Sequence, residues 1–116
     1  MAALKRQPVV PDPSRVRRIA GGFGWIDHRL LREGHLERLT FFDIALYLFL
    51  VIVANRDGVS WYRKDVISKK VGMDWSQFET AKARLLERGL IAFKPFAPRE
   101  VDGFYQVLPL PPGGAP

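Results

Sequence analysis

The sequence predicts a mainly helical α+β fold that ends in a β-hairpin. A capped amphipathic helix is expected over residues 75–88, and a short helix over 63–72 precedes it across a turn. Two β-prone segments, 90–93 and 104–110, follow it. The chain has 116 residues, 47% of them hydrophobic, which is enough for one domain with its own core. We therefore expect a basic flexible arm over residues 1–20, a folded domain over 21–110 and a Pro/Gly-rich tail over 111–116.

Positive charge is concentrated in the arm. The formal net charge is +6, and residues 1–20 supply +4 of it, because they hold five basic residues and one acidic residue. A basic chain attracts polyanions, of which nucleic acid is the first expectation. Arg15, Arg17 and Arg18 are predicted to follow DNA phosphates or to enter a minor groove. The alternative, a solubilising tail, stays open. The arm has no apolar segment typical of a signal peptide, so secretion is not expected.

The first half of the domain is predicted to be helical. Trp25, Ile26, Leu30 and Leu31 lie at helical spacing and predict a short helix over residues 25–33. A loop or turn is expected from Gly34 to residue 39.

A second helix is expected from the residue after Thr40 to about Ala54. Thr40 is a good N-cap, and the carboxylate of Asp43 three residues later can meet the free amides of the first turn. This helix is apolar on nearly every side, so we expect it to be buried on several sides. The apolar run 44–54 is far shorter than the ~20 residues of a membrane span, so no membrane contact is predicted. Either the N-terminal segment covers the whole helix, or a homodimer forms through residues 41–53.

The second half begins with turn residues at 55–58 and a short β-prone segment at 59–62. The helix over 63–72 has Val66, Ile67 and Val71 at helical spacing and Gly72 as its C-cap. In the helix over 75–88, a stripe of Phe78, Ala81 and Leu85 is predicted to be buried. Gly89 ends this helix, and the first strand of a hairpin starts at once.

The opposite face of the 75–88 helix is polar and suited to DNA. It shows hydrogen-bonding side chains together with a small residue that permits close approach to base edges: Ser76, Gln77, Thr80, Ala83 and Arg84. The preceding helix is basic and is expected to lie across a phosphate backbone through Arg63, Lys64, Lys69 and Lys70. The hairpin tip adds Arg99, next to two acids.

The stretch "DVISKKVGMDWSQFETAKARLLERGLI" resembles the winged helix-turn-helix of bacterial DNA-binding proteins. These include the MarR and GntR regulators and the initiator domains of plasmid and phage replication proteins. Val66, Ile67, Val71 and Gly72 match the first part of the motif, and Phe78, Leu85, Gly89, Leu90 and Ile91 match the second. The resemblance covers about residues 36–108. It implies that the 75–88 helix is a recognition helix and that the hairpin is a wing.

Catalytic and metal chemistry are not expected. The chain has no Cys, which removes thiol catalysis and Cys-type metal sites. His28 and His35 have no metal-ligand spacing, and no acid–base pair or Ser/His/Asp group stands out. We expect a cofactor-free, non-enzymatic protein that binds double-stranded DNA in a sequence-specific or structure-specific way. Transcriptional regulation and a replication or mobile-element role both stay open. The expected location is the cytoplasm, with the nucleoid if DNA is bound. The alternative is a winged-helix protein-interaction module without direct DNA binding.

Overall fold

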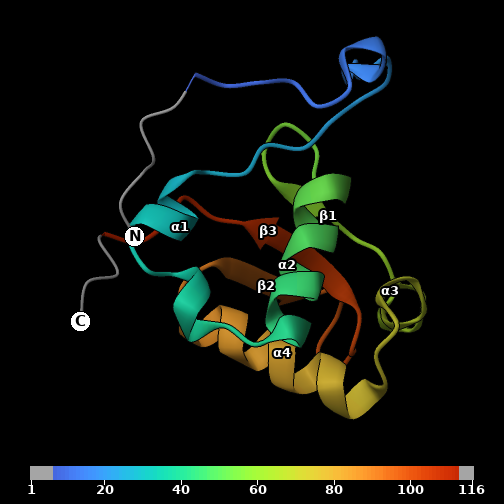
Figure 1. Cartoon of the computed structure of the whole chain (residues 1–116). Coiled ribbons are helices and arrows are strands. Elements are labelled where there is room, and N and C mark those ends of the chain that lie inside the picture. Colours follow the sequence, from blue (N-terminus) through green and yellow to red (C-terminus); the bar gives the residue numbers. More distant parts are fainter. Residues whose placement is uncertain (1–6, 113–116) are drawn as a thin grey trace.

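The computed structural model describes residues 7–112, which form an α+β fold with four α-helices and a three-stranded antiparallel sheet (Figure 1). The helices are α1 (Arg29–Arg32), α2 (Phe41–Val53), α3 (Lys64–Val71) and α4 (Trp75–Glu87). The strands are β1 (Val59–Ser60), β2 (Ile91–Pro95) and β3 (Gly103–Val107), and two 3-10 turns are η1 (Pro13–Arg15) and η2 (Leu36–Arg38). The predicted α+β class is confirmed.

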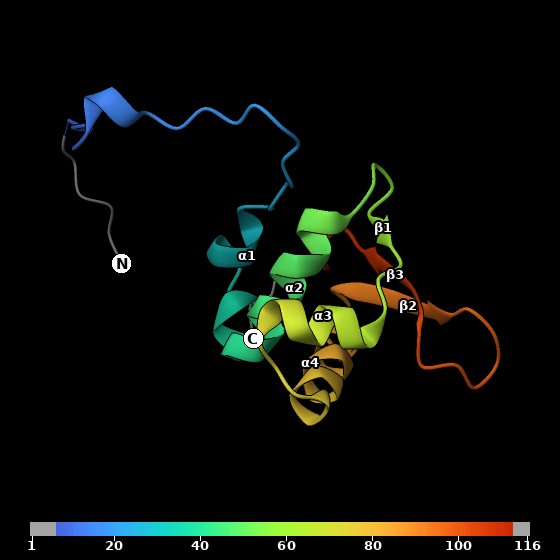
Figure 2. The same cartoon turned by 90° about the vertical axis from the view of Figure 1, so that its right-hand side faces the viewer.

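The sheet and the helices form two layers. The strand order is β1-β3-β2, and β2 and β3 make a hairpin in which Phe93 lies opposite Tyr105. One face of the sheet packs on α2 and α4, and Tyr105 on this face is buried. Phe104 and Gln106 alternate with Tyr105 along β3 and are exposed on the other face. In Figures 1 and 2, α4 lies at one end of the molecule, and the N-terminal arm extends from the other end.

Two capping boxes start the two long helices. In α2, Thr40 Oγ1 accepts a hydrogen bond from the Asp43 amide, and Asp43 Oδ2 accepts one from the Thr40 amide at 2.8 Å. In α4, Asp74 and Gln77 make the same reciprocal pair. Each box satisfies amides that otherwise lack partners in the first turn. Both helices therefore begin where their local sequence places a cap.

Gly89 explains how α4 joins β2 so closely. Its φ is +72°, in the left-handed region that glycine adopts without a steric penalty. The Leu90 amide then donates to the Leu85 carbonyl, and β2 begins at the next residue. The predicted order of helix, glycine and strand is confirmed.

The core lies where α2, α3, α4 and the hairpin meet. The predicted stripe of α4 is confirmed, since Phe78, Ala81 and Leu85 are all fully buried. Leu46 of α2 and Ile67 of α3 are fully buried against the same cluster. The bounds predicted for the helix over 63–72 differ by one residue at each end from those of α3.

The helix predicted over residues 25–33 is wrong in its first half. The α1 helix starts only at Arg29, because the Asp27 carboxylate accepts a hydrogen bond from the Arg29 amide at 2.9 Å and makes the turn there. Trp25 and Ile26 precede this turn and are exposed at 83% and 50%. The loop expected at 34–39 contains η2, and β1 and β3 end earlier than predicted.

The N-terminal segment covers only one side of α2. Leu30 of α1 is buried against the core, and the chain at Gly24 passes close to Val51. Phe41 and Ile52, which it does not cover, are 89% and 61% exposed. The expectation that the N-terminal segment closes over the whole helix is therefore wrong for the described residues.

Candidate nucleic-acid interface

The exposed face of α4 is the surface that the sequence predicts to meet DNA. Burial of the apolar stripe on one side of this helix turns Ser76, Thr80 and Ala83 outward, and all three are exposed. They lie along one line because residues four and three apart share a helix face. A shallow groove of about 410 Å³ runs over Thr80 and Ala83 and is bordered by Glu79 and Glu87. The face is thus narrow and polar, with acids on its edges.

Two other residues predicted for this face have partners inside the chain. The Gln77 side chain closes the capping box, since its Oε1 accepts from the Asp74 amide at 2.9 Å. The guanidinium of Arg84 lies over the N-terminal turn of α2, with Nε 2.9 Å from Oδ2 of Asp43. Asp43 is only 1% exposed, so Arg84 is the counter-charge of a buried carboxylate. Gln77 and Arg84 can each hydrogen-bond to a DNA base only after the side chain leaves its present partner.

The basic helix α3 divides into a buried end and an exposed end. Lys64 is buried: its ammonium pairs with Glu79 of α4 and lies 4.5 Å from the centre of the Trp75 ring. Its amide donates to Asp102 of the hairpin at 2.7 Å, so a residue from the β2–β3 loop caps α3. Lys69 and Lys70 at the other end of α3 are exposed. Of the lysines predicted on α3, these two remain available for phosphate.

Arg63 stands next to the buried end and has a partner of its own. Its guanidinium contacts the Asp65 carboxylate at 2.5 Å and 3.0 Å. These hydrogen bonds lower the pKa of Asp65 below its usual value of 3.8 and raise the pKa of Arg63. Both side chains are largely exposed, so the pair can open when a phosphate competes for the arginine.

The arm and the hairpin tip do not join the α4 face. Arg15, Arg17 and Arg18 are exposed, and Arg15 pairs with Asp12 at 2.6 Å. In Figures 1 and 2 this segment lies at the opposite end of the molecule from α4. Arg99 is exposed in the β2–β3 loop with a φ of +70°. The predicted site residues therefore form at least two separate basic regions.

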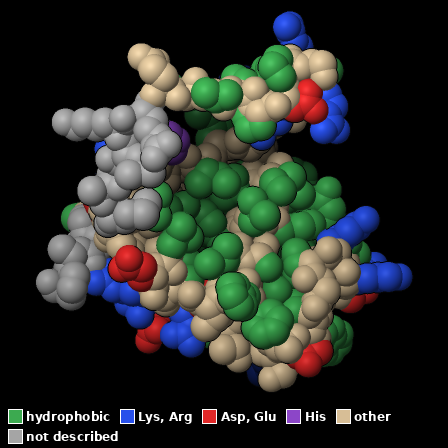
Figure 3. Space-filling model, in the orientation of Figure 1, with side chains coloured by type: hydrophobic (Ala, Val, Ile, Leu, Met, Phe, Trp, Pro, Cys, Tyr) green, Lys and Arg blue, Asp and Glu red, His purple; other side chains and the backbone are tan. Residues whose placement is uncertain are grey.

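The structure leaves an apolar surface over α2 exposed. In Figure 3, hydrophobic side chains cover the centre of the face that α2 presents, and most charged side chains lie towards its edge. Phe41, Leu48 and Ile52 are exposed along the outer side of the helix, with the half-buried Ala45 between them, and we call these four residues the α2 face. Their spacing of four, three and four residues was visible in the sequence, but their exposure was not.

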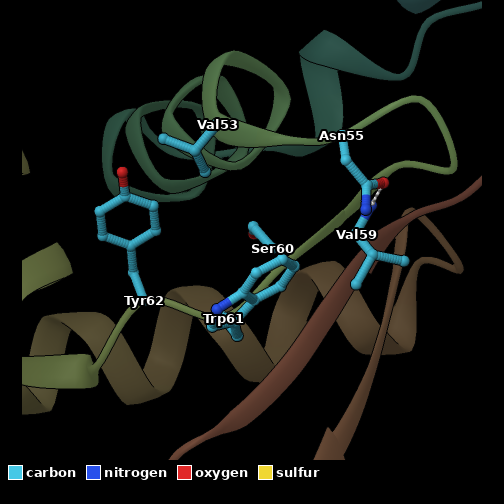
Figure 4. A pocket seen from close by; sticks show the side chains of 6 residues that line it. All are labelled: Val53, Asn55, Val59, Ser60, Trp61 and Tyr62. Carbon is cyan, nitrogen blue, oxygen red and sulfur yellow. Dashed lines mark hydrogen bonds between the residues drawn. The ribbon is translucent and has the colours of Figure 1, made fainter.

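A hollow between the end of α2 and β1 was also missed. It has a volume of about 390 Å³ and is lined by Val53, Asn55, Val59, Ser60, Trp61 and Tyr62 (Figure 4). The Asn55 side chain is occupied, because its Oδ1 accepts from the amides of Asp57 and Val59. Tyr62 packs edge-on against Phe49 of α2, with ring centres 5.4 Å apart. The hollow is therefore mainly an aromatic and apolar surface, and it offers no acid–base pair.

No cluster of three or more metal-ligating side chains occurs within residues 7–112. None of the helices in this range is long and apolar enough to cross a membrane. A comparison of the chain with known protein families, with curated proteins and with solved structures finds no match. The function proposed below therefore depends on the surface of the molecule itself.

Proposed function

We propose that the chain is a winged-helix protein that binds duplex DNA. The observation that supports this best is the exposed line of Ser76, Thr80 and Ala83 on α4, directly after a helix that ends in two exposed lysines. Short polar and small side chains let a helix approach the base edges of a major groove. In this proposal α3 and α4 are the helix-turn-helix, and the β2–β3 hairpin is the wing.

The charges around α4 are compatible with this mode of binding. Glu79 borders the groove, but the ammonium of Lys64 neutralises it. Glu87 lies in the last turn, away from the N-terminal half that enters the groove in helix-turn-helix proteins. Lys69 and Lys70 then supply phosphate contacts beside the turn between the two helices. Transcriptional regulation and a role in replication or mobile elements fit equally, because both use the same contacts.

The arm would be a second, independent phosphate contact. Its three exposed arginines lie far from α4, so they reach either a distant part of the same duplex or a different one. Removal of residues 1–18 should therefore lower the affinity for DNA and make the slope of log affinity against log salt shallower. The contacts of α4 should stay intact.

Fluorescence anisotropy with a random duplex at several salt concentrations tests the proposal. The double variant Lys69→Gln, Lys70→Gln should make the slope of log affinity against log salt shallower by about 0.9 for each lost phosphate contact. Thr80→Asp places a carboxylate in the groove-facing line and should weaken binding by about five- to 150-fold, since a lost base contact is worth about 1–3 kcal/mol. Gln106→Glu is the matched control, because it adds the same charge on the open face of the sheet. No binding by the wild type at low salt would contradict DNA binding altogether.

A second function, protein–protein interaction, is favoured by one specific observation. The α2 face is exposed and apolar, with Phe41 at 89% and Ile52 at 61%. Exposed apolar patches of this kind usually mark surfaces that contact a partner. Residues 41–53 would then hold either a second copy of the chain or another protein. This function and DNA binding are compatible, since they use different surfaces.

A further inference from the structure

The α2 face has the pattern of a helix–helix seam. Phe41, Ala45, Leu48 and Ile52 follow one another at intervals of four, three and four residues. Intervals that alternate between four and three residues are typical of helices that pack along a shared stripe. Phe41 is 89%, Leu48 44% and Ile52 61% exposed, so these three side chains face away from the core. Ala45 between them is half-buried and also packs against the core. All four side chains are uncharged.

The surroundings extend this stripe into a surface of interface size. A groove of about 650 Å³ runs beside it and is lined largely by apolar side chains of α1, η2 and α2, among them Ile26, Leu30, Leu36 and Ile44. Ile26 and Leu31 in its lining are 50% and 71% exposed. With ~200 Å² for each fully exposed large side chain, the three large stripe residues and these two offer about 600 Å². A stable complex needs about 800 Å² from each partner, so these five side chains supply most of an interface.

We propose that two copies of the chain pair through their α2 faces, with the helices antiparallel across a twofold axis. This inference names the partner for the second function proposed above and does not depend on DNA binding. The intervals of four, three and four residues are the same when they are read from either end of the helix. In an antiparallel pair, each residue of the stripe therefore lies opposite one residue of the other stripe. Phe41 lies against Ile52 of the partner subunit, and Ala45 lies against Leu48 of the partner subunit.

The side-chain sizes fit this antiparallel register. The small Ala45 leaves room for the large Leu48 of the other copy, and this happens twice because the interface is symmetric. In a parallel pairing Ala45 would face Ala45 and leave a gap in the middle of the seam. Such a gap loses packing contacts, which makes the parallel pairing the poorer one. A second copy is therefore the partner that the face itself specifies.

Sedimentation or light scattering at micromolar concentration tests the dimer. The wild type should have about twice the chain mass of 13.2 kDa. Leu48→Glu places a carboxylate in the centre of the seam and should give the monomer, with an unchanged circular dichroism spectrum. Val101→Glu is the matched control, because Val101 is 60% exposed on the β2–β3 loop, and it should remain a dimer. A monomeric wild type, or a dimer that Leu48→Glu leaves intact, would overturn the proposal.

Disulfide crosslinking tests the orientation, and the background is clean because the chain has no cysteine. In the antiparallel pairing, Phe41→Cys and Ile52→Cys should crosslink only when the two variants are mixed. The two Phe41 positions lie eleven residues apart along the seam, about 16 Å at the helical rise, beyond the roughly 7 Å that a disulfide can bridge. Crosslinking of Phe41→Cys with itself would overturn the antiparallel register.

The same samples separate this inference from the proposed functions. Anisotropy with duplex DNA reports DNA binding for the wild type and for Leu48→Glu alike. A wild type that is monomeric yet binds DNA overturns only the dimer. In that case the partner of the α2 face would be a different protein.

Discussion

The ion pair between Arg84 and Asp43 gives the sharpest prediction about stability. Arg84→Ala removes the counter-charge of a carboxylate that is 1% exposed and that also caps α2. The remaining partner of Asp43 Oδ2 is the Thr40 amide at 2.8 Å, and Oδ1 has no hydrogen-bond partner within residues 7–112. The variant therefore leaves a buried charge with too few compensating contacts.

The expected loss follows from the geometry. Removal of one partner of a buried ion pair costs about 3–5 kcal/mol. Arg84 is itself 35% exposed, so water screens part of its interaction and can enter the space that it leaves. We expect a loss of about 2–3 kcal/mol, which is a large part of the 5–15 kcal/mol that stabilises a typical domain. The melting temperature should fall by roughly 10–20 °C.

Urea and thermal unfolding of four variants would measure this loss. Arg88→Ala is the matched control, because Arg88 is an exposed arginine that follows the same helix, and it should change stability by less than about 0.5 kcal/mol. Asp43→Asn keeps a cap on α2 and removes the buried charge, so it should cost less than Arg84→Ala. The double variant should cost less than the sum of the two single changes.

One result would refute the reasoning. If Arg84→Ala unfolds within about 0.5 kcal/mol of the wild type, Arg84 is not the required counter-charge of Asp43. Arg84 would then be free to meet DNA, as the sequence pattern first indicated.

Three further predictions concern the hairpin and α3. Asp102→Ala removes the carboxylate that caps α3 from the β2–β3 loop and should lower the free energy of unfolding by about 1 kcal/mol in urea titrations. Gly103→Ala puts a Cβ 2.1 Å from the Lys94 carbonyl oxygen of the opposite strand and should cost at least about 1–3 kcal/mol, while Gly21→Ala, with open space around it, should be nearly neutral in the same assay. Arg63→Ala should raise the pKa of Asp65 back towards 3.8 in a carboxyl NMR titration, because the lost hydrogen bonds no longer stabilise the carboxylate; an unchanged pKa would mean that the pair does not persist in solution.

The sequence by itself determined the elements whose causes lie within a few residues of one another. The Thr40 and Asp43 pair fixed the start of α2, and Gly89 fixed the end of α4, because caps and left-handed turns depend on local chain geometry. The helical period predicted the buried stripe of α4 for the same reason. Gln77 could have been recognised too. Its place three residues after Asp74 is the same capping pattern, which assigns its side chain to the helix end.

The tertiary structure alone decided which charges are free and which apolar face stays open. Asp43 and Arg84 meet only because α2 packs across α4, and Lys64 is buried only because the hairpin and α4 close around it. These partners are far apart in the chain, and the register of the packed elements brings them together. In the same way, every side of α2 is apolar, so its sequence has no period that marks the buried side. The neighbours that pack on α2 make that choice, and they leave Phe41, Leu48 and Ile52 exposed.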